Sequence, residues 1–142
     1  MQNRRSFIKK TCALCLSVVG GGALVSQLSS CTPMPVFKAV VVKNILAVPF
    51  TAFTEGNNSV IVRNSSIPFD ILLVKKSNGI YTALEMKCSH QDNPLTANKT
   101  GLFCSSHGST FDLEGNVLKE PALKPIKKYK TEIESSFVHI IL

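Results

Sequence analysis

The chain has 142 residues, a length that fits one domain preceded by a targeting segment. It carries 16 basic and 9 acidic residues, and four of the basic residues lie within the first ten positions. The remaining 12 basic residues leave the rest of the chain a net charge of only +3. A late lysine cluster, residues 124–130, has Tyr129 as its only aromatic member, which favours a solvated face and argues against nucleic acid as a partner.

Residues 1–30 have the layout of an export signal. A basic start is followed by the apolar run "TCALCLSVVGGGALVSQLSS", which contains no acidic residue. The run is short for a membrane span, and its consecutive glycines at 20–22 weaken a helix, so removal is favoured over permanent anchoring. We therefore expect residues 1–30 to direct export and residues 31–142 to form the working domain.

Two short motifs refine this expectation. "NRRSFIKK" resembles the twin-arginine export signal, with Arg4 and Arg5 as the pair and Asn3 in place of the usual serine or threonine. "LSSC" resembles a bacterial lipobox, which implies that Cys31 is lipidated and becomes the first residue of the mature protein. The mature protein is expected on the periplasmic side or in the cell envelope. The implied two or three acyl chains would hold the protein on a membrane surface, whereas one chain would be marginal. The alternatives are an ordinary cleaved signal or an uncleaved anchor, with Cys31 a bystander.

From Pro33 onward the sequence is typical of β-structure. Short runs rich in Val, Ile and Phe alternate with turn clusters such as "EGNNS" and "KSNG", and no helical period follows residue 31. The expected strands are 36–42, 45–50, 59–63, 69–76, 79–86, 127–133 and 137–142. The runs 69–76 and 79–86 are predicted to form a hairpin. We expect an all-β fold, a small antiparallel barrel or sandwich, with a polar segment at about 87–111 inserted between its strands.

The inserted segment places a cysteine near a histidine twice. In "KCSHQDNPL" Cys88 and His90 are two positions apart, and in "FCSSHGSTF" Cys104 and His107 are three apart. Two thiolates and two imidazoles suit either tetrahedral zinc or a [2Fe–2S] cluster with cysteines on one iron and histidines on the other. Zinc fingers place both cysteines in one short motif, whereas each motif here holds one cysteine and one histidine. This mixed pairing favours the two-iron centre and leaves zinc as the alternative.

The two motifs in this order, followed by "DLEGNVLKEPALKP", resemble the Rieske [2Fe–2S] family. The resemblance implies a Rieske-type fold and one [2Fe–2S] cluster per chain. It implies that Cys88 and Cys104 bind the buried iron as thiolates. His90 and His107 would bind the outer iron through ring nitrogens.

The resemblance also implies roles for residues around the cluster. Gly108 would give its tight loop room because it lacks a Cβ. Ser109 matches the serine whose hydroxyl bonds a cluster sulfur in high-potential members. Leu95 would cover one flank, and Pro121 would sit in a shielding loop. Glu120 replaces the glycine that commonly precedes this proline in the family, so the shielding loop departs from the family pattern at this turn.

Two departures from the family pattern bear on the reduction potential. Rieske proteins of quinol-oxidising complexes carry a disulfide where this chain has Asn93 and Ser106, so that crosslink cannot form. They also carry a tyrosine where this chain has Phe111, which removes a hydroxyl donor to a ligand sulfur. Hydrogen-bond donors to the sulfurs stabilise the reduced, more negative cluster and raise its potential. With the Ser109 hydroxyl retained and the hydroxyl at position 111 lost, we expect an intermediate reduction potential.

The expected function is one-electron transfer by an exported, membrane-associated protein between redox donor and acceptor proteins. The alternative is a Rieske subunit of a larger quinol- or arsenite-oxidising complex, and a zinc-binding or cluster-free lipoprotein is a further, less favoured alternative. His139 is expected to be a structural strand residue. Once His90 and His107 are used, no histidine pair remains for an oxygenase iron site, so we expect an electron-transfer protein and not a stand-alone enzyme.

Overall fold

Strands dominate the part of the chain that the computed structural model describes, residues 33–142. The expected export signal lies outside the described residues, and so do Arg4, Arg5 and Cys31. Within 33–142 the helical element is one short 3-10 turn, η1 (Phe50–Ala52). No helix in that range has the length and hydropathy needed to cross a membrane.

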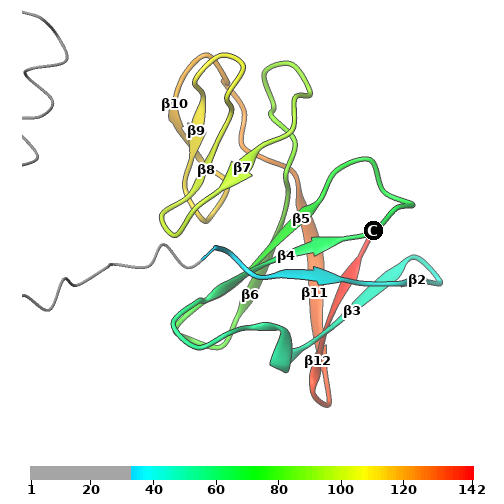
Figure 1. Ribbon diagram of the computed structural model, residues 1–142. Coiled ribbons are helices and arrows are strands. Elements are labelled where there is room, and N and C mark those ends of the chain that lie inside the picture. Colours follow the sequence, from blue (N-terminus) through cyan, green and yellow to red (C-terminus); the bar gives the residue numbers. More distant parts are fainter. Residues whose placement is uncertain (1–32) are drawn as a thin grey trace, which may run out of the picture. The chain divides into compact units, whose positions relative to one another are not determined.

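The larger of two sheets has eight strands and curls on itself (Figure 1). Its spatial order is β1 (Val36–Lys38), β4 (Ser59–Arg63), β5 (Ile71–Lys75), β6 (Tyr81–Glu85), β11 (Lys128–Glu134), β12 (Phe137–Ile141), β3 (Ile45–Pro49) and β2 (Val41–Val42). All neighbouring pairs are antiparallel except β1 and β4, which are parallel. The two ends of this order, β1 and β2, are joined by only Ala39 and Val40, so the chain links the opposite edges of the curled sheet.

The run 36–42, expected as one strand, is two strands in the structure. The backbone N–H of Ala39 still bonds to the carbonyl of Arg63 at 3.0 Å, beside β4. The chain then leaves that edge at Val40, which is 73% exposed, and pairs as β2 with β3 on the other edge. Apolar composition alone does not mark this change of partner, because both halves of the run suit a strand. The hairpin expected from 69–86 is confirmed as β5 and β6.

Strand β5 separates two hydrophobic cores. Ile71 and Leu73 point into a core enclosed by the large sheet, and Leu72 and Val74 into a second core on its outer side. The uninterrupted apolar run of β5 follows from this position, because a strand covered on both faces has no polar side.

The smaller, four-stranded antiparallel sheet covers the outer face of β5 and β6 (Figure 1). Its spatial order is β10 (Val117–Lys119), β9 (Thr110–Phe111), β8 (Leu102–Phe103) and β7 (Thr96–Ala97). The second core contains Cys88 and Cys104 among its buried members. The expected fold class, a small all-β barrel or sandwich with an inserted subdomain, is therefore confirmed.

Candidate functional site

Two loops with the same hydrogen-bond pattern carry the candidate ligands. In the first loop, the Cys88 N–H bonds to the carbonyl of Asn93 at 2.8 Å, and its carbonyl accepts from the N–H of Asp92 at 2.9 Å. In the second, the Cys104 N–H bonds to the carbonyl of Ser109 at 2.9 Å, and its carbonyl accepts from the N–H of Gly108 at 3.0 Å. Each cysteine is thus fixed by the residues four and five positions later, and each hydrogen-bonded loop contains one histidine.

The fourth position after each cysteine has a left-handed backbone. Asp92 has φ +54° and Gly108 has φ +81°. A Cβ at Gly108 would have a single neighbour within 4 Å, the Lys119 Nζ at 3.9 Å. The sequence suggested that Gly108 gives its loop room. The structure shows instead that the glycine is needed for its positive φ. Aspartate tolerates the same region better than most side chains do, which explains how the first loop forms without a glycine.

The loops sort their side chains by chemistry. Cys88 and Cys104 are each 1% exposed and carry free thiols, whereas His90 and His107 are exposed. The two imidazole rings lie together at the surface, with centroids 5.0 Å apart and planes at 85°. The structure thus pairs the two buried thiols with each other and the two exposed imidazoles with each other.

The second loop directs donors at one of the sulfurs. Burial raises the pKa of the Cys104 thiol, but hydrogen bonds from the backbone N–H groups of Ser106 and His107 and from the side chains of Cys88 and Ser106 outweigh burial. The net effect holds the pKa of this thiol below its ordinary value, towards the thiolate that binds metal. Ser106, which the family resemblance places at the position of a disulfide cysteine, donates here to Cys104, the candidate ligand of its own loop.

This donor set fits a two-iron cluster. Among residues 33–142, no three Cys, His, Asp or Glu side chains converge as one metal ion would require. A Rieske cluster needs only two protein ligands on each iron, thiolates on one and imidazoles on the other. The separation of a buried thiol pair from an exposed imidazole pair matches that requirement.

The neighbouring residues singled out from the sequence surround this donor set. Leu95 is 5% exposed and Phe111 1% exposed, and both lie in the core that contains the two cysteines. Ser109 is fully buried, and its Oγ accepts a hydrogen bond from the Ala122 N–H at 3.0 Å. Among the described residues no hydrogen bond uses the Ser109 hydroxyl as donor, so that hydrogen is available to a bound group.

A third segment, residues 118–124, joins both loops through serines. Besides the Ser109 contact, the Ser89 hydroxyl of the first loop donates to the Lys124 carbonyl at 2.5 Å. Pro121 lies half-buried in this segment, after a cis peptide bond from Glu120. Sequence reasoning missed Ser89, Ala122 and Lys124, because contacts of a serine with residues 13 and 35 positions away leave no local pattern.

Glu85 stabilises the strand that leads into the first loop. Its Oε1 accepts from the Tyr129 hydroxyl at 2.6 Å and lies 3.7 Å from the Lys127 ammonium. Partial burial raises the pKa of Tyr129, and the bond to Glu85 raises it further, so the phenol stays a donor at neutral pH. The end of β6 is thereby fixed to β11 just before Cys88.

The third histidine takes no part in the site. His139 lies in β12, opposite Glu132 in the strand register, with its Nδ1 3.4 Å from the Glu134 Oε2. The expectation that it is a strand residue is confirmed.

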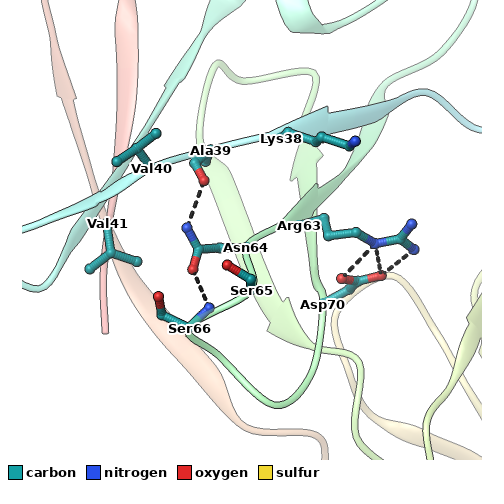
Figure 2. Close-up of a pocket in the computed structure, with 9 residues that line it drawn as sticks. All are labelled: Lys38, Ala39, Val40, Val41, Arg63, Asn64, Ser65, Ser66 and Asp70. Atoms are coloured by element: carbon teal, nitrogen blue, oxygen red, sulfur yellow. Dashed lines mark hydrogen bonds and ion pairs between the residues drawn. The ribbon is translucent and has the colours of Figure 1, made fainter.

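A cavity of the described domain also lies away from the four candidate ligands. It has a volume of about 670 Å³ and is bounded by β1, β2 and the β4–β5 loop (Figure 2). Arg63 and Asp70 in its wall neutralise each other in an ion pair of 2.7 Å, and the Asn64 amide donates to the Ala39 carbonyl. Its lining contains no cysteine or histidine, so it adds nothing to the metal chemistry.

Comparison with known families decides the assignment. Residues 41–130 match the family described as "Rieske [2Fe-2S] domain". The chain belongs to the Rieske [2Fe–2S] family. Its cofactor is therefore a [2Fe–2S] cluster, and the zinc alternative is set aside. Such clusters carry one electron at a time, so the chemistry of this Rieske protein is electron transfer.

Two relatives are described as "Cytochrome b6-f complex iron-sulfur subunit". The one from Chlorobaculum thiosulfatiphilum is 29% identical over 149 aligned positions, covering 96% of this chain and 74% of its own. The one from Chlorobaculum tepidum is 27% identical, covering 92% and 71% respectively. This Rieske protein thus aligns along nearly its whole length with subunits of that description.

Solved structures share the fold at lower identity. The plasma membrane Rieske protein PetC3 from Synechocystis PCC 6803 superposes with a TM-score of 0.51 at 22% identity, over 58% of this chain and 85% of its own. A chain from the complex of oxygenase and ferredoxin in carbazole 1,9a-dioxygenase gives a TM-score of 0.52 at 17% identity, over 70% of this chain and 94% of its own. At these identities the likeness concerns the fold alone.

Proposed function

We propose that Cys88 and Cys104 hold one iron of the cluster and His90 and His107 the other, in loops within about residues 87–111. The observation that supports this assignment is the repeated loop geometry, which buries the cysteine of each loop, leaves its histidine exposed, and sets the two imidazole rings side by side. When bound, the cluster supplies a one-electron carrier. The protein's own residues exclude water from the sulfurs, aim N–H donors at Cys104, and leave the imidazole edges at the surface where an electron can enter or leave.

The assignment is tested on purified full-length protein. We expect about two irons and two acid-labile sulfides per chain and a reduced-state EPR spectrum of mixed Cys/His ligation. Cys88→Ser and His107→Cys should each lose this spectrum, whereas His139→Gln should keep it. Stoichiometric zinc in protein from an iron-replete, anaerobic culture of the native host would overturn the assignment.

We further propose that the protein works as an exported, membrane-associated carrier between a redox donor and an acceptor protein. The export motif and the lipobox-like Cys31 support this proposal from sequence. The working domain would then comprise residues 31–142, held on the membrane through its N-terminus.

The second candidate function is that of a Rieske subunit in a quinol-oxidising complex. The description of the two Chlorobaculum relatives favours it. Purification from native membranes in mild detergent distinguishes the two. A stoichiometric cytochrome that remains bound through two columns would favour the subunit, and elution of the Rieske protein alone would favour the carrier.

A further inference from the structure

Residues 118–124 form an exposed rim beside the two ligand loops, which we call the lysine rim. Its position is fixed, because Ser89 of the first loop bonds to the Lys124 carbonyl and Ser109 of the second accepts from the Ala122 N–H. Leu118 is 66% exposed and Leu123 is 80% exposed. Exposed apolar area beside a functional site is area that a bound partner would remove from water.

The rim also places two cations at the ligand loops. The Lys119 ammonium lies beside Gly108, the residue after His107. The backbone carbonyl of Lys124 accepts from Ser89, the residue before His90, so the Lys124 side chain starts beside the first loop. Both lysine side chains are exposed, and neither forms an ion pair with another residue of the range 33–142.

Other charges at these loops are few. The Asp92 carboxylate of the first loop is neutralised by the Lys87 ammonium at 3.1 Å. Glu120 is exposed within the rim and partly offsets its two lysines. The two lysines outweigh Glu120, so a protein that approaches the imidazole edges meets a net positive charge.

We propose that the lysine rim, together with the exposed edges of His90 and His107, is the docking surface for an acidic electron-transfer protein. The inference rests on the proposed ligand assignment, since docking there matters only if electrons leave by the histidine edge. Carboxylates on the partner would compensate Lys119 and Lys124, and Leu118 and Leu123 would bury apolar area on contact. Charges of this kind act mainly on the rate of encounter, so the proposal predicts a kinetic effect that depends on salt.

The test uses cluster-loaded, full-length protein, reduced and mixed in a stopped-flow instrument with one of two oxidants. Oxidised plant plastocyanin is the acidic probe and horse cytochrome c is the basic one. One electron leaves the reduced Rieske protein and reduces the probe's Cu(II) or Fe(III). We expect the rate constant with plastocyanin to fall as NaCl rises, and the combined change Lys119→Gln and Lys124→Gln to lower it about tenfold at low salt.

The matched control is Lys43→Gln with Lys99→Gln, two exposed lysines in the β2–β3 and β7–β8 turns that also form no ion pair within residues 33–142. This control changes net charge equally and should leave the rate constant within about twofold. Glu120→Gln should raise the rate with plastocyanin. With cytochrome c, the rim double variant should react no more slowly than the wild type.

Several outcomes would overturn the proposal. Equal effects of the rim and control double variants would show that only net charge matters. Rim-dependent binding to phosphatidylglycerol vesicles without a rate effect would assign the rim to a lipid surface. Loss of a wild-type dimer in the rim variant would assign it to a second copy of the chain. Iron, sulfide and EPR measurements on every sample keep the two hypotheses separate, because a missing cluster in the wild type would count against the ligand assignment.

Discussion

Ser109 is the residue whose surroundings give the clearest prediction. Its buried hydroxyl accepts from the Ala122 N–H and retains a hydrogen that no described residue receives. Ser109→Ala should lower the reduction potential, because a donor to the more negative, reduced state is lost. If the lost donor favours the reduced state by about 1.4 kcal/mol, the potential of the variant should be lower by about 60 mV for one electron. This shift is small beside the span of Rieske potentials, roughly −150 to +300 mV.

The same substitution should also cost stability. Removing the hydroxyl leaves the Ala122 N–H buried without its acceptor, at a cost of about 1–3 kcal/mol. Voltammetry and urea unfolding measure the two effects separately. Ser105→Ala, an exposed serine of the same loop, is the control and should change neither quantity. An unchanged potential in Ser109→Ala would refute the donor role.

Phe111 offers the opposite change. It is 1% exposed within the core that contains both cysteines, and Phe111→Tyr adds a hydroxyl there. We expect the potential to rise by an amount on the order of 60 mV, since a donor near the sulfurs favours the reduced state. Phe103→Tyr, at a 38% exposed position on the neighbouring strand, should leave the potential unchanged. Equal potentials in all three proteins would rule out a hydroxyl effect at position 111.

Sequence alone could identify the four candidate ligands, because Cys88, His90, Cys104 and His107 stand in short local spacings. It could not reveal that both loops use one hydrogen-bond pattern, since Asp92 takes in one loop the left-handed position that glycine takes in the other. Nor could it reveal the serine contacts with residues 118–124, which depend on how distant segments fold together.

At the scale of elements, the long strands were predictable and the short ones were not. Strands of five or more residues, such as β5 and β12, have enough apolar positions to show a pattern. Strands β7, β8 and β9 have two residues each and exist because the second core aligns them. The parallel pairing of β1 with β4 was also unpredicted, because it joins strands whose sequences would suit either direction.

The small sheet depends on a close approach at Gly101. A Cβ at this glycine would overlap the backbone carbonyl of Phe111, in the strand paired with β8. Gly101→Ala should push β8 from β9, destabilise the domain by about 3 kcal/mol and lower the iron content. Gly79→Ala, at a positive φ but in open space, should cost only about 1–2 kcal/mol and retain iron. Urea unfolding and iron analysis compare them, and equal costs would contradict a steric role for Gly101.

The β9–β10 turn should make stability depend on pH through Asp112. Burial raises the pKa of this carboxyl, but hydrogen bonds from Asn116 and the Glu114 N–H, together with the charge of Lys128, outweigh burial and hold the pKa below its ordinary value. A carboxyl with a lowered folded-state pKa stabilises the fold above its unfolded pKa of about 3.9. That stabilisation is lost as the pH falls through the folded-state pKa.

Asp112→Asn tests this dependence. The free energy of unfolding of the wild type should exceed that of the variant at pH 6, and the difference should shrink below about pH 4. Asp92→Asn, at an exposed carboxylate of the first loop, is the control for the loss of one charge. A wild-type advantage that stays constant from pH 6 to pH 2 would show that the contribution of Asp112 does not depend on its charge.

At the scale of the whole molecule, the proposed cluster site requires that folding precedes export. Both sulfurs are closed over by two loops and tied to a third segment, so the site is complete only in the folded domain. Cluster assembly draws on cytoplasmic machinery. A protein that acquires its cluster inside and works outside must therefore cross the membrane folded, which is what a twin-arginine route provides.

Export should accordingly depend on the arginine pair, and retention at the membrane on Cys31. Arg4→Lys with Arg5→Lys should trap cluster-loaded precursor in the cytoplasm. The substitutions preserve the charge, but a twin-arginine route recognises the two arginine side chains themselves. Lys9→Arg with Lys10→Arg is the matched control and should be exported normally. Cys31→Ala should release or mislocalise the domain, since the proposed lipid anchor would be lost. Fractionation, immunoblotting and EPR of each fraction measure all three variants. Normal export of the arginine variant would indicate the general secretory route, and unchanged membrane attachment of Cys31→Ala would remove the lipoprotein assignment.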